Sequence, residues 1–158
     1  VKEIKRVSEK FDVQVYLEPG EAVAIGCGIL KSSVLDTGFN ELRQAIIDVS
    51  ATCHMPDVLE MPYHPEIIGA AESEKKKFTY RIGGLTCLAG DVIGDYSFDH
   101  ELQLGETLIF EDMAHYTMVK TSTFNGTKLP AIVVWNSTNN EIKSIKEFGY
   151  EDFRNRLS

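Results

Sequence analysis

The feature that most constrains the fold is a succession of short apolar runs, each closed by a turn signal within a few residues. After "AVAIGCGILKSSVLD" the runs read, in chain order, "QAIIDVS", "KKFTYRI", "GETLIFED", "YTMVKTSTF" and "LPAIVVWN". Each has the length and the β-branched and aromatic content of a strand. The succession predicts a mainly β domain, an antiparallel β-barrel or sandwich, rather than a parallel sheet with crossover helices.

Helices are expected at the two ends of the chain and in one short turn. Apolar residues recur at every third position over residues 1–10, which predicts a helix, and "DVQVYLEPGE" then alternates as a strand that ends in a turn at Pro19. Short helices are expected at "MPDVLEM" and at "GYEDFRNRL", and a solvated loop or hairpin end at residues 70–77. A lone helix and strand leave edges and faces uncovered, so residues 1–20 are interpreted as the end of a larger α/β body.

Composition and charge narrow the class of protein. A chain of 158 residues with 43% hydrophobic and 25% charged residues is typical of one soluble domain, and no apolar run is long enough to span a membrane. A net charge of −8 argues against nucleic-acid partners and favours cationic ligands, although solubility alone explains such a charge equally well. Cys27, Cys53 and Cys87 are odd in number and widely spaced, which indicates reduced thiols in the cytoplasm.

Two residues stand where ligand chemistry is plausible from their position. Glu18 precedes a turn at the carboxyl end of the expected strand, a place where α/β folds put ligand contacts, and a solvated turn residue is the other interpretation. Cys87 lies in "GGLTCLAGDVIGDY", whose glycines let the backbone bend sharply and approach a ligand. Burial as a small apolar side chain is the commoner fate of a free cysteine.

The segment "CHMPDVLEMPYHP", residues 53–65, gathers two histidines, two acids and a cysteine, which suggests a zinc site. The spacing fits no ligand pattern, because the cysteine and the first histidine are adjacent and the second histidine follows ten residues later. No metal site is therefore predicted. The three prolines instead favour a rigid loop that presents Asp57 and Glu60 to a cationic group.

Taken together, the motifs resemble one family from about residue 13 to the C-terminus. "LEPGEA", "SATCHMPDVLEMPY", "GGLTCLAGDVIGDYSF", "DMAHYTMVKTSTFNG" and "FGYEDF" follow one another as in the C-terminal part of the carboxynorspermidine/carboxyspermidine decarboxylases. These are pyridoxal-phosphate enzymes of bacterial polyamine synthesis, and they are similar to the alanine-racemase-fold decarboxylases of ornithine, arginine and diaminopimelate. The resemblance implies pyridoxal 5'-phosphate as cofactor, a polyamine-type substrate, and a homodimer with active sites at the subunit interface.

The family fold is an N-terminal (β/α)8 barrel followed by a C-terminal β-domain, the fold-type III arrangement. By this resemblance residues 1–20 are the last helix and strand of the barrel, and residues 21–158 are the β-domain with short helices. The family's cofactor-binding lysine and glycine-rich phosphate loop lie in the barrel portion, so the complete protein is expected to be a carboxy-lyase and this chain alone to be inactive. The alternatives are a noncatalytic β-domain that pairs with a separate barrel chain, or a decarboxylase of another basic amino acid.

The resemblance also implies roles for single residues. Glu18, in the EPG motif with Gly20, matches the glutamate that pairs with the pyridine nitrogen of the cofactor. Tyr116, expected in a strand with His115 on the opposite face, matches a tyrosine that contacts the cofactor phosphate. Cys87 matches a cysteine that reaches into the partner subunit's active site and donates a proton.

Three positions depart from the relatives. Glu21 stands where they carry a phosphate-binding arginine, so that contact must come from elsewhere. Leu88 replaces the substrate-binding acid that follows the cysteine, which leaves Asp91 as either a substrate contact or an interface acid. Glu60 falls where diaminopimelate decarboxylases carry a substrate-binding arginine, and this reversal of sign suits a substrate that ends in an amine.

Overall fold

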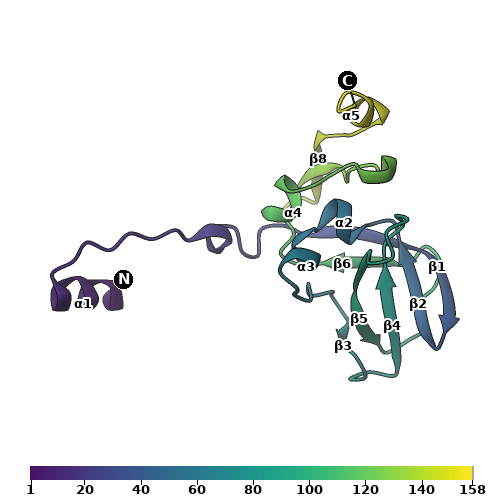
Figure 1. Ribbon diagram of the computed structural model, residues 1–158, viewed down its shortest axis with the longest axis horizontal. Coiled ribbons are helices and arrows are strands. Elements are labelled where there is room, and N and C mark those ends of the chain that lie inside the picture. Colours follow the sequence, from purple (N-terminus) through teal and green to yellow (C-terminus); the bar gives the residue numbers. More distant parts are fainter. Residues whose placement is uncertain (158) are drawn as a thin grey trace.

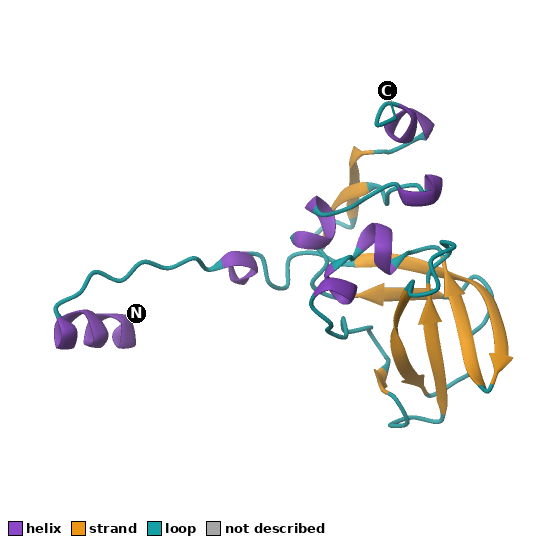
Figure 2. Cartoon of the chain, in the orientation of Figure 1, coloured by secondary structure: helices purple, strands orange, loops and turns teal. Residues whose placement is uncertain are grey.

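The computed structural model describes residues 1–157, and its main body is a six-stranded sheet with short helices gathered near one end of the strands (Figures 1 and 2). In chain order the elements are α1 (Lys2–Phe11), the 3₁₀ turn η1 (Gly20–Val23), β1 (Leu30–Asn40), β2 (Leu42–Ile47), α2 (Ala51–His54), α3 (Asp57–Glu60), β3 (Ala71–Glu72), β4 (Phe78–Gly83), β5 (Val92–Phe98), β6 (Thr107–Phe110), α4 (Tyr116–Val119), the 3₁₀ turn η2 (Phe124–Gly126), β7 (Ile132–Asn136), β8 (Glu141–Lys146) and α5 (Tyr150–Arg154).

The strand order in the sheet is β3-β5-β4-β2-β1-β6, and β7 and β8 form a separate antiparallel ribbon. The predicted mainly β architecture is confirmed. One neighbouring pair differs from the antiparallel expectation, since β2 and β4 run parallel, with Ala45 opposite Ile82. The chain between them, residues 48–77, carries α2, α3 and β3 and returns to the end of the sheet from which β2 started.

The long strand β1 curls the sheet. Its first half, from Leu30 to Ser33, pairs with β6, and its second half, from Val34 to Asn40, pairs with β2. An irregularity in the β1–β2 register between Val34 and Asp36 marks the change of partner. Because a bulge bends a strand and increases its twist, β1 wraps from one part of the sheet to the other. The inward-facing side chains of the curled sheet meet in one core.

The core follows from alternation along the strands. In β2 the buried positions are Ala45 and Ile47, two residues apart, as expected for a strand with one face covered. Burial of such side chains is the main favourable term in folding. The largest apolar side chains that are completely enclosed are Phe110, Ile47, Met55 and Ile82.

The predicted N-terminal helix is confirmed as α1, which stands apart from the sheet at the end of an extended segment (Figure 1). The predicted strand at "DVQVYLEPGE" is wrong, because residues 13–19 lie in no strand and their side chains are exposed. A strand needs a neighbour to satisfy its backbone hydrogen bonds, and the described chain offers this segment none. The division of the chain at residue 20 stays a prediction.

The predicted strand at "YTMVKTSTF" is also wrong. Tyr116 begins the short helix α4, and His115 precedes it, so the two residues do not alternate across a sheet. The local β-branched content favours a strand, but the backbone is satisfied within the segment, by Met118 N donating to His115 O at 2.9 Å and Lys120 N to Tyr116 O at 2.9 Å. The short helices predicted at "MPDVLEM" and "GYEDFRNRL" are confirmed as α3 and α5.

Candidate active site

A cleft of about 770 Å³ lies where the N-terminal segment meets the short helices. Its walls come from η1, α3, the loop after α3, the loop after β6, and α4. This volume is within the usual range of small-molecule sites. The lining residues are Pro19, Gly20, Glu21, Ile25, Asp57, Met61, Tyr63, His64, Pro65, Glu66, Glu111, Asp112, His115, Tyr116, Thr117 and Lys120.

Several of the residues singled out in the sequence line this cleft, and two of them, Gly20 and Tyr116, face each other. Gly20 has a φ of 51°, a conformation that glycine adopts without strain. A Cβ atom on Gly20 would lie 4.0 Å from the Tyr116 hydroxyl, so the glycine faces this tyrosine across 96 positions of sequence. Glu18 is exposed two residues before Gly20 and does not line the cleft. The structure therefore brings Gly20 and Tyr116 together and leaves Glu18 at the margin.

The cleft is strongly anionic. Its lysine, Lys120, faces a set of carboxylates contributed by several segments of the chain. The pKa of the Tyr63 phenol is raised above its ordinary value, first by burial and then by the negative charges around it. Such a site favours a ligand that carries several positive charges. The lining carboxylates are Glu21, Asp57, Glu66, Glu111 and Asp112.

Glu60 is close to the cleft and already holds a cation. Its Oε2 atom lies 2.6 Å from Lys120 Nζ, and Asp57 accepts a second hydrogen bond from the same ammonium group. Hydrogen bonding to Asp57 and then to Glu60 raises the pKa of Lys120. The two carboxylates on α3 thus form a pair that binds a primary ammonium group, here one supplied by the chain itself.

Two buried polar atoms on the cleft wall have no hydrogen-bond partner in the described structure. His115 Nδ1 lies 3.3 Å from Glu21 Oε2, but His115 Nε2 is enclosed and unpaired. The Thr117 hydroxyl is also unpaired, on a residue that is only 7% exposed. Buried polar groups without partners are rare, so these atoms, on either side of Tyr116, fit a site that receives a polar ligand group. Sequence analysis missed Thr117, whose only signal is its place beside Tyr116.

Cys87 and Asp91 belong to a different part of the molecule. Cys87 is exposed on the loop between β4 and β5, which excludes the buried, purely apolar interpretation of this thiol. It does not line the cleft of its own chain. Asp91, at the end of the same loop, is only 4% exposed, and its carboxylate points inward to Ser50 and Thr86.

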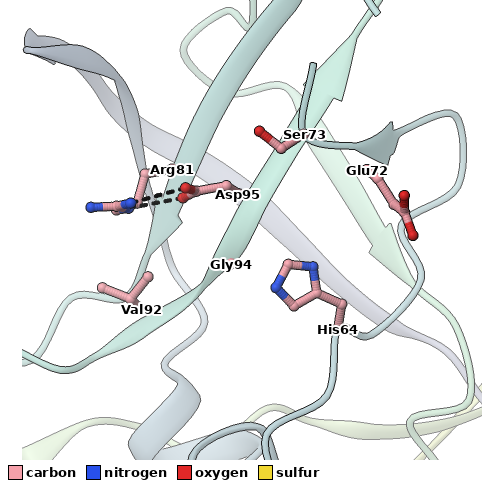
Figure 3. Close-up of a pocket in the computed structure, with 7 residues that line it drawn as sticks. All are labelled: His64, Glu72, Ser73, Arg81, Val92, Gly94 and Asp95. Atoms are coloured by element: carbon pink, nitrogen blue, oxygen red, sulfur yellow. Dashed lines mark hydrogen bonds and ion pairs between the residues drawn. The ribbon is translucent and has the colours of Figure 1, made fainter. Parts of the chain in front are cut away.

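A second hollow, of about 650 Å³, lies on the face of β4 and β5 (Figure 3). Arg81 donates two hydrogen bonds to Asp95, at 2.8 and 2.9 Å, which lowers the pKa of the aspartate. His64 lies across the hollow from this pair and stacks on Tyr96, with ring centroids 5.3 Å apart. The arginine is paired with an aspartate within the hollow, and none of the predicted catalytic, cofactor-binding or substrate-binding residues lines it.

The described part of the chain shows neither a metal-ligand cluster nor a membrane-spanning helix. Within residues 1–157, no group of three or more His, Cys, Asp or Glu side chains is arranged to hold a metal ion. In the same part of the chain, every helix is too short or too polar to cross a bilayer.

Known proteins resemble this chain in both sequence and structure. The model of the C-terminal sheet domain of pyridoxal-dependent decarboxylases matches residues 16–114. The chain is 52% identical over 146 residues to carboxyaminopropylagmatine decarboxylase of Synechocystis sp., and the match covers 92% of this chain and 38% of that protein. It is 46% identical over 160 residues to carboxynorspermidine/carboxyspermidine decarboxylase of Campylobacter jejuni, with 94% and 42% covered.

A solved structure agrees with these relatives. The crystal structure of carboxynorspermidine decarboxylase from Campylobacter jejuni, complexed with norspermidine, superposes with a TM-score of 0.84 at 44% identity and covers 96% of this chain. The chain spans only 38% to 44% of the length of these three proteins. Because the family model matches residues 16–114 and the two relatives are 52% and 46% identical, the chain belongs to the pyridoxal-dependent decarboxylases and corresponds to their C-terminal sheet domain.

Proposed function

We propose that the chain is the C-terminal part of a homodimeric decarboxylase that converts carboxynorspermidine or carboxyspermidine to the free polyamine. The observation that carries this proposal is the anionic cleft beside Gly20 and Tyr116, lined by five carboxylates and one lysine. A polyamine is a chain of ammonium groups, and each gains a charge-assisted hydrogen bond from a carboxylate. The Campylobacter jejuni relative, crystallised with norspermidine, supports the same substrate class.

The cofactor's phosphate would be held at the Gly20 end of the cleft. Tyr116 offers a hydroxyl donor there, and the backbone at Gly20 lies close to that hydroxyl. The unpaired His115 Nε2 and Thr117 hydroxyl would supply further polar contacts. These groups would supply the phosphate contact that an arginine makes in the relatives, where this chain has Glu21. When bound, pyridoxal phosphate supplies the electron sink that makes loss of carbon dioxide possible.

Glu18 and Cys87 would act on the reacting end. Glu18 accepts a hydrogen bond from the pyridine nitrogen, and its position just before the cleft residues Pro19 and Gly20 brings it within reach once the barrel is present. The Cys87 thiol donates a proton to the carbon that has lost carbon dioxide. Because Cys87 is exposed and lies outside the cleft of its own chain, the proton donor would serve the cleft of the partner subunit.

Glu60 and Asp57 would bind the distal ammonium group of the substrate. Both belong to α3, and together they accept hydrogen bonds from the ammonium group of Lys120 in the structure, which supports this assignment. The complete protein would contain the barrel, act as a homodimer and reside in the cytoplasm, where the exposed thiols of Cys27 and Cys87 stay reduced. The 158-residue chain alone would be inactive.

A second substrate is favoured by one observation. The relative with 52% identity is a carboxyaminopropylagmatine decarboxylase, and agmatine ends in a guanidinium group rather than an ammonium group. A pair of carboxylates such as Asp57 and Glu60 also suits the planar fork of a guanidinium. Release of carbon dioxide from the three carboxylated substrates, measured as kcat/KM with the full-length protein, decides between them.

The test of the proposal uses Glu60→Gln in the full-length protein. Removing one negative charge from the Asp57–Glu60 carboxylate pair should raise KM for carboxynorspermidine. Glu141→Gln, on the exposed strand β8, should leave KM unchanged. An unchanged KM in Glu60→Gln removes this residue from the substrate site. Absence of turnover with all three carboxylated substrates would instead support a noncatalytic β-domain, and preference for a simple basic amino acid would support the other alternative.

A further inference from the structure

We propose that Asp91 is the positioning residue that holds the cysteine loop, residues 84–91, in the shape that presents Cys87. The inference rests on the proposed role of Cys87 as proton donor and adds a residue to that site. The carboxylate is only 4% exposed and is hydrogen-bonded inside its own chain, which favours this positioning role over direct contact with a substrate.

The carboxylate of Asp91 accepts hydrogen bonds from four donors. The Ser50 hydroxyl lies 3.0 and 2.9 Å from its two oxygens, and Thr52 N lies 3.2 Å from Oδ1. Thr86 contributes both its backbone N, at 3.1 Å from Oδ2, and its hydroxyl, at 2.6 Å. Hydrogen bonds to an ionised acceptor are stronger than those between neutral groups, so this buried charge is compensated by well-placed donors.

The same residue closes the loop through its backbone. Gly84 N donates to Asp91 O at 2.8 Å, and Asp91 N donates to Leu88 O at 2.9 Å. The carboxylate then fills the interior of the loop so closely that a Cβ atom on Gly84 would lie 2.4 Å from Oδ2. The path of the backbone on both sides of Cys87 is therefore determined by contacts with Asp91.

The donors outside the loop tie it to the rest of the domain. Ser50 is the N-cap of α2, where its hydroxyl accepts from Cys53 N at 3.1 Å, and Thr52 belongs to that helix. Asp91 thus connects the cysteine loop to the helical end of the sheet. An asparagine in its place would keep one acceptor oxygen. Its NH₂ group cannot accept a hydrogen bond and would face groups that now donate to the carboxylate.

Steady-state kinetics of the full-length protein test this role with a matched pair. Thr86→Val removes one donor hydroxyl next to Cys87, and Thr86→Ser retains it. A misplacement of about 1 Å can cost about 100-fold in rate, so Thr86→Val and Asp91→Asn should lower kcat by about 10- to 100-fold with little change in KM, while Thr86→Ser keeps most of the activity. A residue that serves only stability would lower the melting temperature and leave kcat of the folded enzyme unchanged.

Thiol chemistry provides a second readout. In a Cys27→Ser background, the rate at which a small aromatic disulfide modifies Cys87 should change in Asp91→Asn and Thr86→Val and stay the same in Thr86→Ser. Wild-type kcat and thiol rates in Thr86→Val would overturn the inference, even if Asp91→Asn fails to fold. Full activity in Cys87→Ala would instead refute the proposed role of the cysteine, which distinguishes failure of the proposed function from failure of the inference.

Discussion

Gly84→Ala should be the most damaging single-methyl change in the cysteine loop. The added Cβ atom would lie 2.4 Å from Asp91 Oδ2 and 2.7 Å from its carboxyl carbon, inside the distance that real contacts allow. The carboxylate cannot simply move aside, because Ser50, Thr52 and Thr86 hold it. Overpacking costs about 1–3 kcal/mol, and losing a hydrogen bond to a charged group adds about 1.5–3 kcal/mol, so we expect a destabilisation of about 3–5 kcal/mol.

Gly90→Ala is the matched control, since it lies in the same loop and a Cβ atom there meets nothing within 4 Å. It should be neutral, or stabilising by about 0.4–1 kcal/mol through the unfolded state. The measurement is urea unfolding of the 158-residue chain, with the midpoint and slope fitted for both variants. Equal midpoints for Gly84→Ala and Gly90→Ala would refute the close approach of Asp91 to Gly84 and weaken the argument for a rigid cysteine loop.

Three other predictions concern pH, charge and the core. Burial lowers the pKa of His54 below 6.5, so below this pH the unfolded chain binds more protons than the folded one. The free energy of unfolding should therefore decrease as the pH falls below 6.5, by at most about 1.4 kcal/mol per pH unit. His54→Gln should remove this slope in urea titrations. Lys120→Gln, but not Lys31→Gln, should tighten inhibition of the full-length enzyme by norspermidine, because it frees two carboxylates; an unchanged inhibition constant would contradict this. Phe110→Ala should lower the free energy of unfolding by about 3–5 kcal/mol in urea, whereas the exposed Phe39→Ala should lower it by about 0.5 kcal/mol or less. Equal losses in the two variants would contradict the position of Phe110 in the core.

Sequence reasoning succeeded where the signal is local. Short apolar runs rich in β-branched and aromatic residues predicted β2, β4, β6 and β7, and the turn residues that close these runs predicted the loops between them. It failed at "YTMVKTSTF" and "DVQVYLEPGE", whose composition is that of strands. Whether such a segment becomes a strand depends on a neighbouring edge that can exchange hydrogen bonds with it, and this is a property of the fold rather than of the segment.

The candidate site shows the same division between local and non-local information. The resemblance to the decarboxylase family singled out Gly20, Tyr116, Glu60, Cys87 and Asp91. It left the function of Asp91 open, because the decisive partner, Ser50, lies 41 positions away in the sequence. It also said nothing of Lys120 as the cation held on α3. Hydrogen-bond partners of this kind become neighbours only when the sheet has formed.

By itself, the sequence determined the mainly β class, the acidic character of the chain, and the motifs by which the chain resembles its decarboxylase family. Those properties depend on residue types and on spacings along one segment. Only the tertiary structure decided that carboxylates from five separate positions converge on one cleft, and that Cys87 is exposed while Asp91, four residues later, is buried. The physical reason is that burial and charge compensation are set by contacts between distant segments, which a curled sheet creates when it folds.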